Sequence, residues 1–216
     1  MELKKMSDKF SDLLKRFPKL EYSKDAIKKA DELLITTARN NGTIFTMGNG
    51  GSASDSDHIV GELMKSFIKK RKIDDEYKKK LIRVDSELGS ELATQLQGGI
   101  KSISLTQHTA LTTAFSNDVN PYLGFAQQLS ILANKGDSVI CISTSGNSKN
   151  VIYAAIVAKA KGLNIIGLTA KGNGILSNYC DICIQVDETE TYKVQELHLP
   201  IYHALCISLE NEFWGD

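Results

Sequence analysis

Five short apolar segments alternate with longer amphipathic segments along most of this chain, and this alternation restricts the fold more than any other feature. The expected strands cover residues 43–47, 102–105, 138–143, 164–169 and 182–186. The expected helices show apolar residues at helical spacing and cover residues 52–68, 109–116, 121–134, 148–161 and 191–212. Strands that are apolar on both faces and separated by helices form parallel sheets covered on both sides. The sequence therefore predicts a doubly wound α/β fold, a three-layer αβα sandwich.

Residues 2–40 precede this alternation and contain apolar residues at helical spacing. We expect two amphipathic helices there, broken near Pro18, and the pair Asn41-Gly42 is typical of a helix C-terminus. Their apolar stripe has no obvious partner within the chain, so we expect it to form a subunit interface. A length of 216 residues fits one domain, residues 1–216, with these helices as an N-terminal extension.

Residues 69–100 interrupt the alternation and are treated as an insertion-like segment. They begin KKRKIDDEYKKK and end LGSELATQLQGG, with charges of both signs at helical spacing. This pattern predicts a solvated helix or a loop.

Composition excludes several classes of partner. The 26 Lys and Arg residues equal the 26 Asp and Glu residues, which argues against nucleic-acid binding. No apolar run is long enough to span a bilayer, and the N-terminal residues lack a signal-peptide core, so we expect no membrane partner and a cytoplasmic location.

The four cysteines do not form a recognisable metal motif. Cys180 and Cys183 make a single CxxC, whereas a zinc site of this kind needs a second pair. Because residues three apart on a strand point to opposite faces, we expect these cysteines, with Cys141 and Cys206, to be buried structural thiols.

A glycine-rich segment, residues 48–52, lies between the first expected strand and the following helix. Glycines allow close approach of the backbone to a ligand, and a helix N-terminus offers unpaired N–H groups to an anion. A tight strand–helix turn would use the same residues. The segment matches neither the Walker loop nor the dinucleotide fingerprint.

A serine-rich segment, residues 143–148, follows the third expected strand and again opens a helix. Its sequence, STSGNS, places several hydroxyls beside backbone N–H groups, which suits a phosphate. An N-cap followed by a turn would need one serine. The number of hydroxyls therefore favours phosphate binding.

Polar residues also share helix faces. His58 and Glu62 are four residues apart, so they lie on one face of the expected helix. Gln195 and His203 lie about 80° apart on the last expected helix and can face one pocket, with His198 on the other side. Each residue taken alone would be interpreted as a surface or structural side chain.

The motifs GNGGSASDSDH (48–58), STSGNS (143–148) and QELH (195–198) closely resemble those of the sugar isomerase (SIS) family, in its phosphoheptose isomerase branch. The resemblance implies a five-stranded parallel sheet, a homotetramer and active sites formed between subunits. It also implies isomerisation of sedoheptulose 7-phosphate to D-glycero-D-manno-heptose 7-phosphate through an enediol. The alternatives are an SIS isomerase for another phosphosugar, or a non-catalytic SIS protein that binds phosphosugars or acts as an adaptor.

The resemblance assigns roles to individual residues. It implies a zinc site formed by His58, Glu62, Gln195 and His203, with Glu62 and His203 as the proton-transfer pair. A carboxylate and an imidazole suit proton transfer beside a carbonyl. The residues expected to contact the substrate or its phosphate are Asn49, Gly50, Gly51, Ser52, Asn117, Asp118, Ser143, Thr144, Ser145, Ser148, Thr191 and Gln195. Asp55 also matches a family position. The retention of Glu62 and His203 argues against a non-catalytic protein, because the serine segment alone would suffice for binding.

Overall fold

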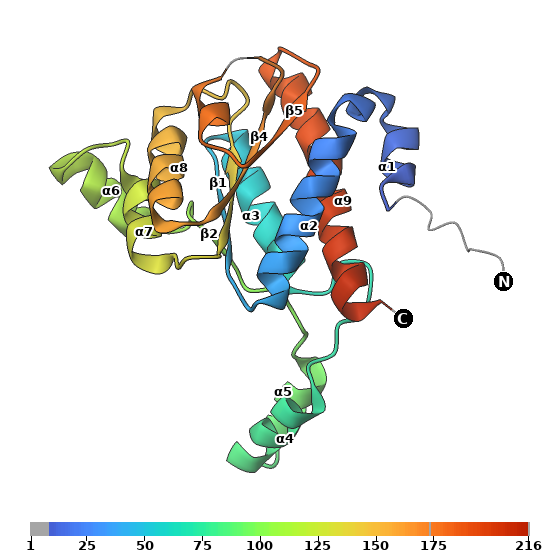
Figure 1. Cartoon of the computed structure of the whole chain (residues 1–216). Helices are drawn as coiled ribbons and strands as arrows, with labels where there is room; N and C mark the ends of the chain where they lie inside the picture. Colours follow the sequence, from blue (N-terminus) through green and yellow to red (C-terminus); the bar gives the residue numbers. More distant parts are fainter. Residues whose placement is uncertain (1–8, 173, 216) are drawn as a thin grey trace.

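A computed structural model describes residues 9–172 and 174–215 and contains one five-stranded parallel sheet (Figure 1). The strand order is β2-β1-β3-β4-β5. The strands are β1 (Ile44–Met47), β2 (Ser102–Ser104), β3 (Ser138–Ile142), β4 (Asn164–Ala170) and β5 (Ile182–Val186). The five predicted strands and their parallel arrangement are confirmed.

The strand register brings the two ligand-binding segments expected from the sequence to one edge of the sheet. Ile44 of β1 pairs with Ser102 of β2 on one side and with Ser138 of β3 on the other. The segments that follow β1 and β3 therefore leave neighbouring strands at their carboxyl ends. In open α/β sheets this edge is where ligands bind.

Helices cover both faces of the sheet, which confirms the three layers (Figure 1). One layer holds α2 (Lys24–Arg39), α3 (Gly51–Met64) and α9 (Thr191–Trp214). The other holds α6 (Thr109–Asp118), α7 (Gly124–Leu132) and α8 (Lys149–Lys161). These bounds agree with the predicted helices to within about four residues.

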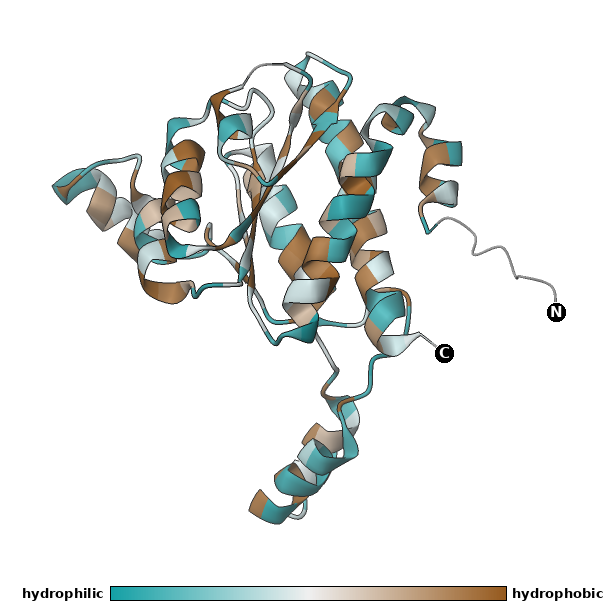
Figure 2. Cartoon of the chain, viewed as in Figure 1, coloured by the Kyte–Doolittle hydropathy of each residue, from teal (hydrophilic) through white to brown (hydrophobic). Residues whose placement is uncertain are grey.

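Alternation along the strands divides the core in two. In β3, Ile140 and Ile142 belong to the core on the α2–α3–α9 side, whereas Val139 and Cys141 belong to the core on the other side. Figure 2 shows the corresponding hydrophobic colour along the strands and on the helices that cover them. Both faces of the sheet are thus buried, as the continuous apolar runs predict.

The N-terminal region breaks where Pro18 predicts. It comprises α1 (Ser11–Arg16), a 3₁₀ helix over Pro18–Ser23, and α2, while residues 2–8 of the expected first helix lie outside the described residues. The predicted free apolar stripe is wrong for α2, because Ile27, Ala30 and Leu34 are buried in the core beside α9 and the sheet.

The insertion-like segment contains two helices, α4 (Asp75–Val84) and α5 (Leu88–Gln95), which pack on each other and project from the sheet (Figure 1). Helix α4 buries no residue, so of the two predicted alternatives the solvated helix holds for α4, whereas Arg71 and Ile73 of the same segment are buried. Asp74 caps α4 by accepting a hydrogen bond from Tyr77 N, 2.8 Å away. Of the described residues, none belongs to a helix long and apolar enough to cross a bilayer.

The expected arrangement of the CxxC thiols is wrong. Cys180 precedes β5 and does not follow the alternation of that strand, so its thiol and that of Cys183 lie on the same side, against Gly167. A Cβ atom at Gly167 would lie 2.7 Å from Cys180 Sγ and 3.2 Å from Cys183 Sγ. All four cysteines are free, and the CxxC pair is half-buried, whereas Cys141 and Cys206 are buried.

Candidate active site

The glycine-rich segment forms the tight turn between β1 and α3. Gly50 has φ of 55°, a value that side chains disfavour. A Cβ at Gly48 would lie 2.4 Å from the carbonyl oxygen of Ser52. Two of these glycines are thus required by the turn itself, whatever ligand the turn binds.

A pair of asparagines joins the glycine-rich segment to the start of α8. Asn49 Nδ2 donates to Asn150 Oδ1 at 2.9 Å, and Asn150 Nδ2 donates to Asn49 Oδ1 at 2.8 Å. This reciprocal amide pair holds the segments after β1 and β3 together. Sequence analysis missed Asn150, because its partner lies 101 residues away.

The serine-rich segment borders a cavity of about 330 Å³ at the carboxyl edge of the sheet. Its wall includes Thr144, Ser145 and Thr191, three of the residues predicted to contact phosphate or substrate. Ser143 Oγ instead donates to Ser148 Oγ at 3.0 Å, and Ser52 is buried. The structure thus brings part of the predicted phosphate site together in one cavity.

Lys171 is a cation in the wall of this cavity that sequence analysis missed. It follows β4, the strand next to β3, and its Nζ lies 3.3 Å from Asp187 Oδ1. The signal that could have identified Lys171 from the sequence is its position directly after a strand, at the edge of the sheet where ligands bind. A lysine beside several hydroxyls adds positive charge where a phosphate would bind.

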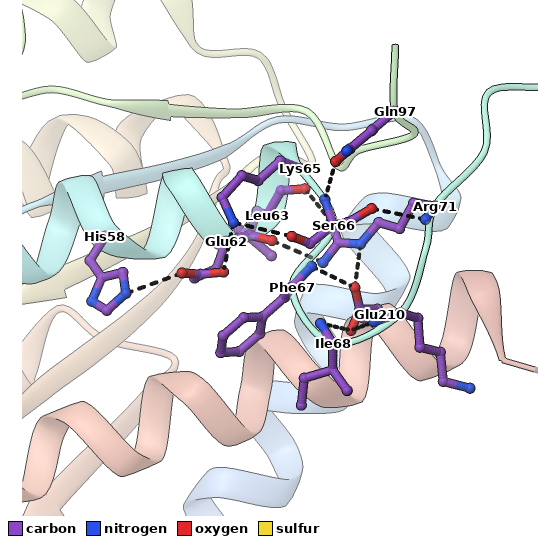
Figure 3. Close-up of polar contacts among 11 residues, drawn as sticks. His58, Glu62, Leu63, Lys65, Ser66, Phe67, Ile68, Arg71, Gln97 and Glu210 are labelled. Carbon is purple, nitrogen blue, oxygen red and sulfur yellow. Dashed lines mark hydrogen bonds and ion pairs between the residues drawn. The ribbon is translucent and has the colours of Figure 1, made fainter. Parts of the chain in front are cut away.

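His58, Glu62 and His203 converge where α3 packs on α9. His58 Nε2 lies 3.2 Å from Glu62 Oε1, and the His58 and His203 ring centroids are 5.0 Å apart. Figure 3 shows the His58 ring directed at the Glu62 carboxylate. Glu62 Oε2 and His203 Nε2 are buried without a hydrogen-bond partner among the described residues. Burial, assisted by nearby His58, lowers the pKa of His203, so its imidazole is neutral at physiological pH.

Gln195 lies apart from this group, near the N-terminal ends of α3 and α9. A Cβ at Gly51 would lie 2.6 Å from Gln195 Nε2, so Gln195 packs on the start of α3. His203 lies instead in the wall of a cavity of about 550 Å³ between α1 and α9. The expected metal ligands thus extend along the helix pair, and His198, which was expected on the other side of the helix, is fully buried.

A buried ion pair holds the chain that follows Glu62 (Figure 3). Arg71 donates through Nε to Glu210 Oε1 at 2.7 Å and through Nη2 to the Glu62 carbonyl oxygen at 2.9 Å. The carboxylate of Glu210 also accepts backbone N–H groups from residues 67–69. Burial by itself would raise the pKa of Glu210, but these hydrogen bonds hold that pKa below its usual value.

Asn117 and Asp118 lie apart from the other predicted site residues. They end α6, where Asn117 Nδ2 donates to Asp118 Oδ1 at 2.7 Å and both side chains are exposed. Figure 1 places α6 on the far side of the sheet from α9. Within one chain they therefore do not meet the Glu62 and His203 group.

Comparisons of the sequence and of the structure with known proteins identify similar proteins of one kind. Residues 99–208 match the SIS domain family. A phosphoheptose isomerase from Helicobacter hepaticus is 36% identical over 87% of this chain and 82% of its own length. A phosphoheptose isomerase from Aliarcobacter butzleri is 34% identical over 89% of this chain and 88% of its own length. The solved structure of a phosphoheptose isomerase from Neisseria gonorrhoeae matches with a TM-score of 0.67 at 26% identity, covering 93% of this chain and 97% of that one.

Proposed function

This chain belongs to the phosphoheptose isomerase branch of the SIS domain family, and we propose that it converts sedoheptulose 7-phosphate to D-glycero-D-manno-heptose 7-phosphate. The proposal is carried by two features of the structure, a cavity with hydroxyls and a lysine at the sheet edge and an α3–α9 contact that holds a carboxylate and two imidazoles. The first group suits the phosphate of the sugar, and the second suits proton transfer at its carbonyl end.

The reaction moves a proton between neighbouring carbons without net oxidation. Glu62 removes the proton from the carbon next to the carbonyl, which produces an enediol-type intermediate. His203 carries a proton between the two oxygens at the opposite side of that intermediate. Because burial keeps His203 neutral, its unprotonated nitrogen can accept that proton. The proton held by Glu62 then returns to the former carbonyl carbon, which completes the isomerisation.

A panel of phosphosugars tests this function directly. Sedoheptulose 7-phosphate, other ketose and aldose phosphates, and unphosphorylated sedoheptulose are incubated with the protein, and the products are identified by NMR. We expect turnover of sedoheptulose 7-phosphate in preference to the others. Turnover of a different phosphosugar would assign another substrate, and binding without turnover would favour a non-catalytic protein.

We propose that the protein uses zinc, which when bound would polarise the carbonyl oxygen as a Lewis acid. His203 Nε2 is buried without a hydrogen-bond partner among the described residues, which supports an ion near His58. Glu62 Oε2 has Lys65 Nζ 3.7 Å away, and Gln195 is the fourth expected ligand. In the part of the chain that the structure describes, no three His, Cys, Asp or Glu side chains are close enough to hold a metal as they stand.

Purification without chelator, followed by elemental analysis, is expected to find about one zinc ion per subunit, and His203→Gln is expected to lose most of it. The change His108→Gln is the control, because His108 is exposed and outside this group. Full activity in protein shown to be free of metal would contradict a catalytic role for zinc.

We propose a homotetramer with the α1–α9 region at a subunit contact. The cavity there is lined in part by Leu13, Phe17 and Leu199, and Leu199 is exposed in the single chain. Light scattering at micromolar concentration is expected to give the mass of four chains, and the mass of one chain would contradict the assembly.

We also propose a cytoplasmic location, because the four free cysteines suit a reducing compartment. Cell fractionation tests this location.

Replacement of Ser145 by alanine is expected to raise KM for the phosphorylated sugar by roughly 10- to 100-fold. A hydrogen bond to a charged group contributes about 1.5–3 kcal/mol, and Ser145 lies in the wall of the proposed phosphate cavity. Steady-state kinetics measure the effect. Ser130→Ala, an exposed serine on α7, is the control, and an unchanged KM for Ser145→Ala would contradict this placement.

A further inference from the structure

The helix pair α4–α5 makes too few contacts within its own chain to explain why it is folded. Helix α4 has 10 residues and buries none, and α5 has 8 residues and buries only Gly89 and Ala93. Among the described elements these two helices pack closely only on each other, and Figure 1 shows them projecting from the rest of the chain. Helices shorter than about 12–15 residues are marginally stable in water, and most helical stability in proteins comes from the packing of an apolar face. A surface outside the single chain therefore has to cover this pair.

One side of the pair, here called the hairpin face, presents large apolar side chains to solvent. Val84 of α4 is 88% exposed and Leu88 of α5 is 60% exposed. Tyr77 lies seven residues before Val84, and Leu92 lies four residues after Leu88, so each helix contributes one stripe of two exposed residues. The hairpin face thus consists of Tyr77, Val84, Leu88 and Leu92.

A groove on the other side of the pair shows that the two stripes share one face. This groove, of about 640 Å³, is lined by Ile82 of α4 and by Ser90 and Thr94 of α5. Two residues along a helix are a rotation of about 200°, so Val84 points away from Ile82, and the two leucines of α5 point away from Ser90 and Thr94. Both stripes therefore lie opposite the groove.

The charges beside the hairpin face fit a second copy of the same surface. Helix α4 contains four basic and two acidic residues, whereas residues 85–96 contain three acidic residues and no basic one. Lys78 and Lys80 pair with acidic residues of their own helix, but Lys79, Arg83 and Glu87 form no ion pair within the part of the chain that the structure describes. Two copies of such a hairpin attract each other when the basic helix of one lies on the acidic helix of the other.

The close approach of α5 to α4 determines which charges are level with each other along the hairpin. The helices meet where a Cβ at Gly89 would lie 2.2 Å from the Leu81 carbonyl oxygen. Because α4 and α5 are antiparallel, positions the same number of residues from this meeting point, on the same side of it, are level. Two residues toward the turn, Arg83 of α4 is therefore level with Glu87, which precedes α5.

A two-fold axis along the hairpin places each α4 on the α5 of the other copy without changing these levels. By the same counting, Lys79 is level with Glu91, two residues toward the base of the hairpin. We propose that the hairpin face binds the same face of a second copy of this chain. In that contact Arg83 is level with the partner subunit's Glu87, and Lys79 is level with the partner subunit's Glu91.

The first test removes the apolar part of the contact by combining Leu88→Glu with Leu92→Glu. Both leucines are exposed in the single chain, so the fold is expected to survive, and circular dichroism checks it. A closed tetramer of two-fold symmetry has two kinds of contact, and the α1–α9 contact stays intact. Light scattering at micromolar concentration is therefore expected to show a fall from four chains to two. Ser90→Glu with Thr94→Glu is the matched control, because it puts the same charges at the same spacing on the groove side of α5, and its mass is expected to stay at four chains.

The second test exchanges charges between the two helices. Lys79→Glu with Arg83→Glu makes α4 acidic, and Glu87→Lys with Glu91→Lys makes the α5 side basic, so each variant alone repels its own copy. Each is expected to have the mass of two chains. An equimolar mixture is expected to return to four chains, because the acidic α4 of one variant then meets the basic α5 of the other. A loss of folding would not be repaired by mixing.

A mass that stays at four chains when both leucines are replaced, or a mixture that stays at two, would overturn the proposed contact. The expected starting mass rests on the tetramer proposed above, whereas the contact does not. A wild type of two chains that falls to one without the leucines would support the contact and refute the tetramer, and a wild type of one chain would overturn both. The masses are measured without substrate, so a wild type that isomerises no phosphosugar would refute the proposed function and leave this contact standing.

Discussion

Glu62→Gln is expected to lower kcat for sedoheptulose 7-phosphate by about 10²–10⁴-fold, the usual contribution of a general base. The amide keeps the shape of the side chain but cannot accept the proton from carbon. The proposed phosphate cavity lies at the sheet edge and does not include Glu62, so the KM for the sugar phosphate is expected to change little.

Solvent deuterium incorporation at the carbon next to the carbonyl measures this step directly, because it follows proton removal even when product release limits turnover. Glu32→Gln, an exposed glutamate on α2, controls for the loss of a negative charge. If Glu62→Gln still exchanges that proton at the wild-type rate, Glu62 is not the base. A fall in kcat accompanied by loss of zinc would instead identify Glu62 as a ligand, so metal content is measured on the same samples.

The strands were predictable because both faces of a parallel sheet are buried. Residues 139–142 are apolar at every position, so both faces of this strand are apolar, which is the pattern of a strand in a parallel sheet covered on both sides. The helix pair α4–α5 was less predictable. Its charged residues fit a solvated helix or a loop equally well, and α5 approaches α4 closely at Gly89, where a Cβ would lie 2.2 Å from the Leu81 carbonyl oxygen.

Contacts between distant residues account for what sequence analysis missed at the candidate site. Serines and glycines after strands are local signals, so the two binding segments were found. The partners of these segments, such as Asn150, are ordinary polar residues whose significance depends on the fold. The expected faces of Cys180 and Cys183 were wrong for a related reason, because alternation was applied to a residue that lies before the strand begins.

Arg71 shows the same limit most clearly. In the sequence it lies within KKRK and is interpreted as one charge of a solvated run, yet its side chain is fully buried. Its partner Glu210 lies 139 residues away on α9. The guanidinium also donates to the carbonyl oxygen of Leu63 at 2.8 Å and lies 5.0 Å from the Trp214 ring. It therefore satisfies the carbonyl groups at the end of α3 that the helix itself leaves free.

Arg71→Met is expected to lower the free energy of unfolding by about 3–5 kcal/mol, because removing one member of a buried ion pair leaves the other charge uncompensated. Denaturant unfolding at neutral pH and fixed protein concentration measures the loss. Lys80→Met is the control, since Lys80 is exposed on α4 and surface changes usually stay within about 0.5 kcal/mol.

The choice of neutral pH follows from the direction of the Glu210 shift. The folded protein holds the pKa of Glu210 below its ordinary value of 4.5, so the unfolded chain binds more protons in acid than the folded protein does. The stability that Glu210 contributes is therefore complete above the unfolded pKa and is lost as the pH falls through the folded pKa. At neutral pH the wild type has all of it, and a loss below about 1 kcal/mol in Arg71→Met would show that the backbone N–H groups of residues 67–69 suffice to hold this carboxylate.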